Sequence, residues 1–333
     1  MKALIPVAGA GTHLRPHTYT QPKPLIPVAG KPIISYIIDD LVEAGVREFV
    51  FVIGHLGEKI RDYVQAKHPD IQQEYVYQSS RQGLGHAVWT AREYLRDASE
   101  VFIVLGDTIF DVDFKAIVNE KTSCLGVKKV DDPRNFGVAE LNEHGMVRHV
   151  VEKPRIPKSN LALVGLYKCR EVSELLAALD YIIENDIKTL DEYQLTDAIM
   201  RMIEQGVTFK PCTVKNWFDC GQKDILLETN AMLLKRGAFA SREIPHYENT
   251  IIIHPVNIGK GCRITNSIIG PNVTIGENAK IDYSIVRESI IGSYARIEEV
   301  VLHHSVVGSD AAIRGLSQSL NIGDNTEIDF GKL

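Results

Sequence analysis

The sequence lacks the features that mark disulfide-rich secreted proteins, zinc-binding proteins and membrane proteins. Its five cysteines form no Cys-x-x-Cys pair and are scattered between Cys124 and Cys262. This pattern does not fit a disulfide framework or a zinc site, and it predicts reduced thiols in a cytoplasmic protein. No apolar run approaches the ~20 residues that a membrane helix needs, so we expect no membrane partner. Pro6 and Gly9 interrupt the apolar start of the chain, which argues against a signal peptide.

The sequence also lacks an excess of positive charge. It contains 37 Lys and Arg residues against 43 Asp and Glu residues, for a net charge of −6. An acidic surface does not favour binding to the phosphate backbone of nucleic acids, so we expect no nucleic-acid partner. The 333 residues, 44% of them hydrophobic, are typical of a globular protein with about two domains.

The first part of the chain alternates between apolar strand patterns and amphipathic helical patterns. This alternation predicts a Rossmann-like α/β domain whose mostly parallel sheet carries helices on both faces. Ligands bind such sheets at the carboxyl ends of the strands, where Gly9–Thr12 and Gly106–Asp107 fall. The predicted strands are residues 2–8, 48–53, 73–77 and 101–105, and the predicted helices are 32–44, 58–66, 85–95 and 222–236.

A short-period repeat occupies the C-terminal part. An aliphatic residue followed by glycine recurs at Ile258-Gly259, Ile269-Gly270, Ile275-Gly276, Ile291-Gly292, Val307-Gly308 and Ile322-Gly323. A six-residue step, with an offset at Ile269, predicts short strands of which about three complete one coil of a β-helix. Asn257, Asn272 and Asn278 are expected at its corners, because asparagine tolerates a positive φ. A β-sandwich, the alternative, has longer strands that alternate at period two.

These patterns divide the chain into three parts. Residues 1–236 are expected to form the α/β domain, residues 237–250 a polar linker, and residues 251–333 the β-helix.

A turn rich in small residues follows the first strand. Gly9, Ala10 and Gly11 let backbone N–H groups approach a phosphate chain closely, and Thr12 adds a hydroxyl. The turn matches neither the Walker A loop nor the GxGxxG pattern, so an ordinary strand-to-helix turn is the alternative. Lys23 then stands between Pro22 and Pro24, a rigid mount for one positive charge.

The stretch GAGTHLRPHTYTQPKPLIPVAGKPI (residues 9–33) resembles the N-terminal signature of the sugar-1-phosphate nucleotidyltransferases. Further segments of this chain resemble family motifs in the expected order. They are Gln78–Gly83, Leu105-Gly106-Asp107, Phe136-Gly137-Val138, Val151-Glu152-Lys153-Pro154, Gly165-Leu166-Tyr167 and Trp217–Gly221.

The resemblance implies that an NTP and a hexose 1-phosphate react to give an NDP-sugar and pyrophosphate, without a covalent intermediate. It implies Mg²⁺ held by Asp107 and Asp219, and Lys23, Arg15 and His13 as catalytic residues. It further implies nucleotide binding by Ala8, Gly9, Ala10, Gly11, Thr12, Gln78 and Gly83, and sugar-phosphate binding by Gly137, Glu152, Lys153, Gly165 and Tyr167. Many members carry a C-terminal left-handed β-helix, for which we expect a role in homo-oligomer assembly.

Two residues depart from the family pattern. His13 stands where the family has arginine, and Phe136 stands where many members have tyrosine. A histidine lacks the permanent, forked positive charge that grips phosphates, unless Arg15 replaces it. The sequence therefore allows an active enzyme, an enzyme weakened by His13, or a silent homologue that binds sugar nucleotides. Glucose 1-phosphate with dTTP or UTP is the expected pair, with mannose 1-phosphate and GTP as the alternative.

The β-helix admits one other function. Hexapeptide-repeat acyltransferases use a histidine base, and His303 and His304 lie in this part of the chain. Neighbouring histidines on a β-helix are more often surface residues, so we favour assembly over acyl transfer.

Overall fold

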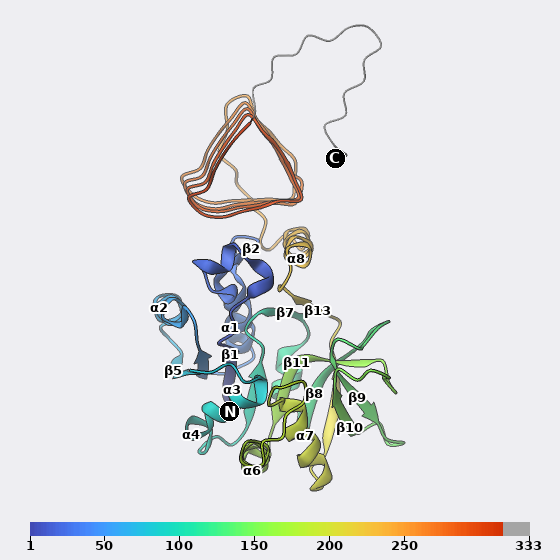
Figure 1. Cartoon of the computed structure of the whole chain (residues 1–333). Helices are drawn as coiled ribbons and strands as arrows, with labels where there is room; N and C mark the ends of the chain where they lie inside the picture. The colour runs from blue at the N-terminus through green and yellow to red at the C-terminus, as the bar shows by residue number, and fades with distance from the viewer. Residues whose placement is uncertain (316–333) are drawn as a thin grey trace. The chain divides into compact units, whose positions relative to one another are not determined.

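The computed structural model describes residues 1–315, which form two compact units (Figure 1). The first unit comprises Met1–Ile26 and Pro32–Gly221. The second comprises Pro27–Lys31 and the residues from Gln222 onward. Part of the N-terminal signature segment thus belongs with the C-terminal part of the chain.

The first unit is built on one nine-stranded sheet. Its strands lie in the order β5 (Gln72–Tyr77), β4 (Glu48–Ile53), β1 (Lys2–Val7), β6 (Val101–Val104), β11 (Leu161–Cys169), β8 (Ser123–Lys129), β12 (Phe209–Thr213), β10 (Val147–Glu152) and β9 (Gly137–Leu141). Strands β5, β4, β1 and β6 pair in parallel, as expected. The four strands predicted from the sequence are confirmed to within one residue at each end.

The expectation of a mostly parallel sheet is wrong for the other half. Strand β11 runs antiparallel to β6, β8 and β9, and β10 runs antiparallel to β9 and β12. Only β8 and β12 pair in parallel there. Parallel strands need a long crossover connection, usually a helix, and no helix separates the strands from β8 to β11. The sheet is therefore mixed.

Helices cover this sheet and close its core. The core joins apolar side chains of the strands to those of α3 (Leu84–Thr90), α6 (Val172–Glu184) and α7 (Leu195–Glu204). Helices α1 (Ile33–Glu43) and α2 (Gly57–Lys67) match the prediction, whereas the helix predicted at 85–95 is interrupted at Ala91 and resumes as α4 (Arg92–Leu95). The unit also contains α5 (Phe114–Val118) and the paired strands β7 (Thr108–Asp111) and β13 (Asn216–Asp219). No helix among residues 1–315 is long and apolar enough to cross a membrane.

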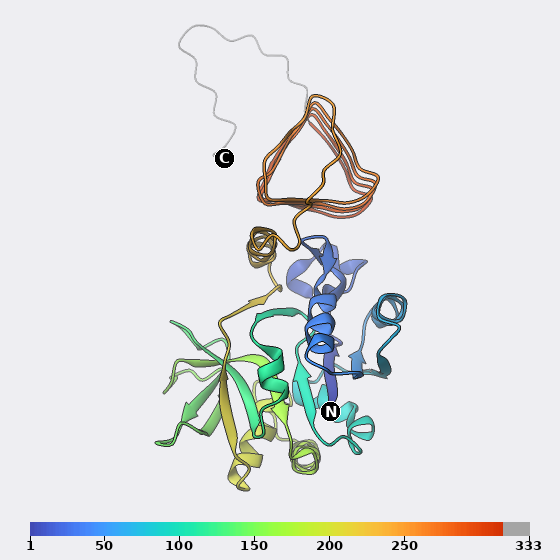
Figure 2. The same cartoon turned by 180° about the vertical axis from the view of Figure 1, so that it is seen from behind.

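The second unit contains a three-sided coil, seen end-on in Figures 1 and 2. Its strands stack into three parallel sheets, one on each side. The β14 face comprises β14 (Ile251–Ile252), β17 (Ile268–Ile269), β20 (Ile285–Arg287) and β23 (Val301–His303). The β15 face comprises β15 (Val256–Ile258), β18 (Val273–Ile275), β21 (Ile290–Ile291) and β24 (Val306–Val307). The β16 face comprises β16 (Arg263–Thr265), β19 (Lys280–Asp282), β22 (Arg296–Glu298) and β25 (Ala312–Arg314).

The coil confirms a three-sided stack of parallel strands and corrects two details. Asn272 and Asn278 have a positive φ, but Asn257 lies within strand β15. The register also departs from a strict six-residue step, because Ile252 pairs with Ile269 and Ile269 pairs with Val286. The predicted repeat Ile322-Gly323 lies outside the described residues.

One buried asparagine holds the Pro27–Lys31 segment within the second unit. Asn230 of helix α8 (Lys223–Lys235) is fully buried, and its Oδ1 accepts hydrogen bonds from Ala29 N at 2.9 Å and Thr274 Oγ1 at 2.6 Å. Its Nδ2 donates to Asn272 O at 3.1 Å. Ala29 and Gly30 both adopt a positive φ, which forms the tight turn that presents Ala29 N–H to the asparagine. Asn230 therefore links helix α8, the coil and the Pro27–Lys31 turn.

We expect Asn230→Ala to lower the free energy of unfolding by about 1–3 kcal/mol, because it leaves buried polar groups without partners. Chemical denaturation of the purified chain measures this loss. Glu228→Ala, at an exposed position of the same helix, is the matched control and should change stability by less than about 0.5 kcal/mol. Equal effects of the two substitutions would contradict the role of Asn230.

Candidate active site

Lys23 lies between two carboxylates that come from distant parts of the chain. Its Nζ is 2.6 Å from Asp107 Oδ2 and 2.9 Å from Asp219 Oδ1. Asp107 directly precedes β7 and Asp219 ends β13, and the pairing of these strands places Asp219 opposite Thr108. The pairing of two short strands thus brings together the two aspartates that the sequence singled out.

The electrostatics of Lys23 follow from this position. Only 7% of the residue is exposed, and burial by itself disfavours its positive charge. The attraction of Asp107 and Asp219 outweighs burial and raises the pKa of Lys23 above its ordinary value. Lys23 is therefore a firmly protonated ammonium that neutralises two neighbouring carboxylates.

Small residues surround this ion triad closely. A Cβ on Gly221 would lie 3.0 Å from Asp219 Oδ1 and 3.1 Å from Lys23 Nζ. Thr108 is buried, and its hydroxyl donates to Asp107 Oδ1 at 3.3 Å. Sequence reasoning assigned no individual role to Gly221, which ends the Trp217–Gly221 motif, or to Thr108, which directly follows Asp107.

The glycine-rich turn lies against the lysine segment. Gly11 has a φ of 60°, its carbonyl accepts a hydrogen bond from Thr18 Oγ1 at 2.8 Å, and a Cβ there would lie 3.0 Å from Lys23 Cβ. Ala8 is buried, whereas Gly9, Thr12 and His13 are exposed and Ala10 is half-buried. Exposed small residues beside a buried ammonium form a surface that a phosphate chain can approach.

Two exposed basic residues, His13 and Arg15, follow the turn. His13 lies in a short 3-10 turn, Thr12–Leu14, and is exposed. The guanidinium of Arg15, also exposed, stacks over the Tyr19 ring at 5.1 Å from its centroid. Both side chains are accessible to a ligand.

A cavity of about 200 Å³ opens beside the triad. It contains Asp107 and Asp219 together with the four predicted sugar-site residues Gly137, Glu152, Gly165 and Tyr167. Lys153 does not line it: the residue is exposed and has a φ of 41°, and its N–H donates to Phe136 O at 3.0 Å. The rings of Phe136 and Trp217 meet edge to face at 5.6 Å and form an apolar wall.

Glu152 is the acidic residue on the far side of this cavity. Its Oε2 accepts a hydrogen bond from Thr196 Oγ1 at 3.1 Å and would lie 3.1 Å from a Cβ on Gly137. Burial raises the pKa of Glu152, with an opposing contribution from the Thr196 hydrogen bond. Burial therefore disfavours the ionised form of this carboxylate. A ligand that donates hydrogen bonds to it would offset that cost.

Gln78 and Gly83, two of the predicted nucleotide-binding residues, lie together. Gln78 is buried, and its Nε2 is 2.9 Å from His86 Nδ1 and 3.5 Å from Gly83 O. Gly83 has a φ of 102°, and a Cβ there would lie 2.6 Å from Tyr193 O. Neither residue lines the cavity, but Leu84, which follows Gly83, does.

Sequence reasoning missed several residues that line the cavity. Gln194, Leu195 and Thr196, at the start of α7, line it, as does Asn135. The hydrogen bonds Gly85 N–Tyr193 O and Tyr193 N–Gln82 O, both 2.8 Å, fix this segment beside residues 82–85. No motif signalled it. A polar Gln-Leu-Thr stretch opening an amphipathic helix was the available clue.

The aspartate pair fits the cation that the family pattern implies. Asp107 and Asp219 direct one oxygen each at a single positively charged atom, so both can reach one bound cation. Residues 1–315 contain no group of three or more His, Cys, Asp or Glu side chains placed to hold a metal. Mg²⁺ is often bound by one or two carboxylates, with substrate phosphates and water completing its shell. Two convergent aspartates meet that requirement.

The histidines of the coil do not form a comparable site. His303 Nε2 lies 3.0 Å from Glu288 Oε2, and His304 Nε2 lies 3.1 Å from Asp224 Oδ1. His303, Glu288 and Asp224 are more than a third exposed, which is typical of surface pairs.

Comparison with known proteins decides the family. A profile described as "Nucleotidyl transferase" matches residues 2–236. The chain belongs to this family. A second profile, described as "GMPPB C-terminal domain", matches residues 244–321.

Relatives of this nucleotidyltransferase share its sequence over most of its length. The glucose-1-phosphate thymidylyltransferase of Streptomyces griseus is 31% identical over 315 residues, which cover 87% of either chain. The bifunctional protein GlmU of Methanocaldococcus jannaschii is 37% identical over 237 residues, covering 71% of this chain and 55% of that protein. A solved UDP-glucose pyrophosphorylase complexed with UDP-glucose shares the fold, with a TM-score of 0.61, 24% identity, and coverage of 71% of this chain and 98% of that one.

Gly11→Ala should destabilise this nucleotidyltransferase. An L-residue with a φ of 60° costs about 1–2 kcal/mol, and the new methyl group would also press on Thr18 Cγ2 at 2.9 Å. Thermal or chemical unfolding measures the loss. Gly9→Ala is the matched control for stability, because a Cβ on Gly9 meets no atom within 4 Å. A Gly11→Ala variant as stable as Gly9→Ala would show that the turn tolerates a side chain.

Glu152→Gln should stabilise the folded chain at neutral pH. Because the folded pKa of Glu152 is raised, ionisation favours the unfolded chain once the pH exceeds the ordinary carboxyl pKa of about 4.3. The advantage of glutamine is therefore absent below that pH and grows as the pH rises through the folded pKa. Melting temperatures at pH 4 and pH 7.5 test the sign of this pH dependence. Exposed Glu143→Gln is the control, and a pH-independent difference would contradict the assignment.

Proposed function

We propose that this nucleotidyltransferase joins an NTP to a hexose 1-phosphate and releases pyrophosphate. The observation that carries the proposal is the buried Lys23 ammonium, held between Asp107 and Asp219 at the edge of the cavity. The family assignment and the names of the relatives support the same reaction class.

The transfer needs positioning and charge more than proton chemistry. A phosphate oxygen of the sugar phosphate forms a bond to the α-phosphorus of the NTP, and the bond from that phosphorus to the bridging oxygen breaks. The electron pair of that bond leaves with pyrophosphate. No general base is required, because the phosphate monoester is already an anionic nucleophile. Most of the catalysis then comes from bringing two anions together in line.

Each part of the site has a proposed task in this reaction. Lys23 stabilises the negative charge that builds on the phosphates, and N–H groups from Ala8 to Thr12 bind the triphosphate. His13 and Arg15, both exposed beside the turn, meet the outer phosphates. Mg²⁺, held by Asp107 and Asp219, supplies further neutralisation of phosphate charge when it is bound.

The sugar phosphate is proposed to bind in the cavity. Glu152 and the backbone at Gly137 and Gly165 accept or donate hydrogen bonds to its hydroxyls, and Tyr167 lies at its wall. Lys153 directly follows Glu152 in the chain and is exposed, and it is proposed to bind the phosphate of the sugar phosphate. Gln78 and Gly83 are proposed to read the base.

The substrate pair and the domain bounds are also proposals, and the comparison with known proteins supports them. We propose glucose 1-phosphate with dTTP or UTP as the substrate pair, supported by the thymidylyltransferase relative, and mannose 1-phosphate with GTP as the second pair. The division into 1–236, 237–250 and 251–333 is supported by profile matches that end at 236 and begin at 244. A left-handed winding of the coil and homo-oligomer assembly through it complete the proposal.

Pyrophosphate release with Mg²⁺, measured across NTPs and hexose 1-phosphates at several pH values, tests the function. We expect release with one pair, and a loss of about 10²–10³-fold in rate for Lys23→Met, because a positioned charge is removed. Lys67→Met, at an exposed position in the last turn of α2, is the matched control. Circular dichroism checks that both variants fold. Tight binding of an NDP-sugar without release from any pair would overturn the catalytic proposal.

A further inference from the structure

A second cavity, of about 510 Å³, lies beside helix α5 in the first unit. Ala116 and Ile117 of α5 line it together with Cys212 of strand β12. Among residues 1–315, none lines both this cavity and the one beside the ion triad. Cys212 is half-buried, so a small molecule in the α5 cavity can reach its thiol.

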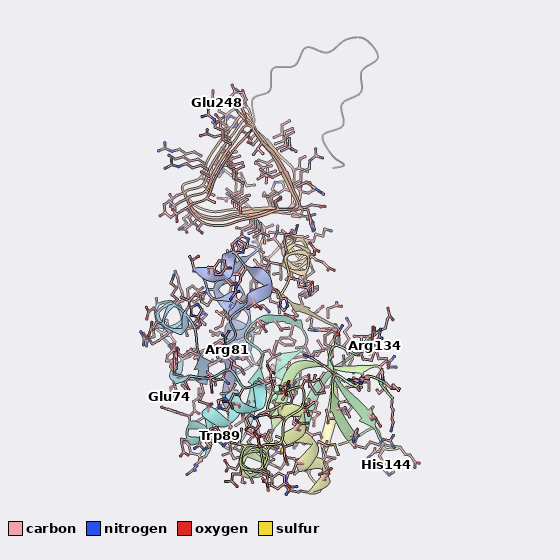
Figure 3. All side chains as sticks on the ribbon, viewed as in Figure 1. Glu74, Arg81, Trp89, Arg134, His144 and Glu248 are labelled. Carbon is pink, nitrogen blue, oxygen red and sulfur yellow. The ribbon has the colours of Figure 1, made fainter. Side chains whose placement is uncertain are left out.

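Another thiol lies next to Cys212 on the neighbouring strand. Strand β12 pairs in parallel with β8, with Lys210 opposite Cys124 and Cys212 opposite Gly126. Alternate residues of a strand share a face, so Cys124 and Cys212 lie on the same face of the sheet. Gly126 has no side chain that could separate them, and the two thiols are in hydrogen-bonding contact. Cys124 is fully buried near the start of β8, and the loop that follows this strand carries Arg134, labelled in Figure 3.

Two lysines flank Cys124 in register. Lys168 of β11 pairs with Cys124 on one side, and Lys210 of β12 pairs with it on the other. Lys168 is only 1% exposed, and its Nζ donates to Val118 O at 2.8 Å. Lys210 is exposed, and its Nζ lies 2.7 Å from Glu120 Oε2. A partly accessible cysteine close to positive charges is the environment in which a thiol reacts as its thiolate.

The two thiols differ in how readily they ionise. The hydrogen bond from the Cys124 thiol, together with the charges of Lys210 and Lys168, outweighs burial and Glu120 and lowers the pKa of Cys212. The same contact and burial raise the pKa of Cys124. Cys212 is therefore the nucleophile of the pair, and Cys124 is the neutral thiol beside it.

We propose that Cys212 and Cys124 form a redox site, which a small uncharged peroxide oxidises to a disulfide. The Cys212 thiolate attacks one oxygen of hydrogen peroxide, the O–O bond breaks, and its electron pair leaves with the other oxygen, which is released as water after protonation. The product is a sulfenic acid at Cys212. The Cys124 sulfur then attacks the Cys212 sulfur, an S–S bond forms, and the sulfenic oxygen leaves as water with the Cys124 proton. Two thiols and one hydrogen peroxide thus give one disulfide and two waters.

The lining of the α5 cavity favours an uncharged oxidant. Asp111, Asp113 and Glu120 line the cavity, and Lys215 is the basic residue among its lining residues in the described part of the chain. This excess of negative charge disfavours the entry of an anionic oxidant. Hydrogen peroxide is neutral and much smaller than the cavity.

The strand that carries Cys212 can move toward Cys124. Within residues 1–315, β12 pairs with β10 at Phe209 and with β8 from Phe209 to Thr213. The Cys212 end of the strand is thus paired with one neighbour in the sheet, which is the strand that carries Cys124. A shift of this end brings the two sulfurs together without breaking a second strand pairing.

This inference goes beyond the proposed function and does not rest on it. Neither cysteine belongs to the proposed catalytic or binding residues, and the readout below is the state of the thiols. Failure of the redox proposal is therefore distinguishable from failure of the catalytic one.

The first test maps the thiols of the full chain after oxidation. The reduced protein is treated with hydrogen peroxide, its remaining thiols are blocked with N-ethylmaleimide, and the digest is analysed by mass spectrometry. We expect a linked Cys124–Cys212 peptide that dithiothreitol separates. Cys262 is the internal reference, because it is also half-buried but burial raises its pKa, and we expect it to lose its thiol at least about tenfold more slowly than Cys212. Equal loss at Cys262 and Cys212, or no linked peptide, would refute the proposal.

The second test separates the roles of the two cysteines. Cys212→Ser should abolish the linked peptide and leave Cys124 reduced. Cys124→Ala should slow the oxidation of Cys212, because the hydrogen bond to its thiolate is lost, and should leave a sulfenic acid that dimedone traps. Cys262→Ser is the matched control and should keep the linked peptide. Circular dichroism checks that the variants fold, and Cys212→Ser, at a half-buried position, suffices if the buried Cys124→Ala variant does not. Oxidation of Cys124 in Cys212→Ser at the rate of the native chain would show that the assignment of the nucleophile is wrong.

Discussion

The meeting of Lys23, Asp107 and Asp219 is the constraint around which the first unit is arranged. Two carboxylates that share one point repel each other unless a cation lies between them, and Lys23 supplies that cation from a segment 84 residues from one partner and 196 from the other. The β7–β13 pairing, the narrow space at Gly221 and the flanking prolines all serve this geometry. Burying the Lys23 charge has a desolvation cost, and the two partly exposed aspartates that offset it remain accessible to a ligand, which points to a role in function.

The local structure of the first half could be read from the sequence because each element carries its own signal. Strands such as Glu48–Ile53 are buried apolar runs, and helix α1 has apolar spacing that ends before Gly45. The sequence of the other half of the sheet carries no local signal for the direction of its strands. Its strands are joined by short loops, and the direction of a strand such as β11 depends on which neighbours it finds in the folded sheet.

The site shows the same division between local and long-range information. Lys23, Asp107 and Asp219 stood in recognisable motifs, and the structure brings them together. Gln194 and Thr196 stood in no recognisable motif. Their place in the cavity depends on hydrogen bonds between residues 82–85 and Tyr193, which no local sequence pattern encodes. In the coil, the repeat gave the stacking, but Asn257 shows that residue type alone does not separate a corner from a strand.

The hairpin at Pro27–Lys31 has a consequence for how this chain can change during evolution. The hairpin begins only four residues after the lysine of the ion triad, yet its turn is held by Asn230, and a Cβ on Gly30 would collide with Asn257. The two units are therefore interleaved in the sequence, because Pro27–Lys31 interrupts the first unit and belongs to the second. A recombination that replaced everything after residue 236 would keep Asn230 and lose Asn257 and Thr274. A coil can therefore be exchanged between relatives only together with a Pro27–Lys31 turn that fits it. The coil and this part of the N-terminal signature must evolve together.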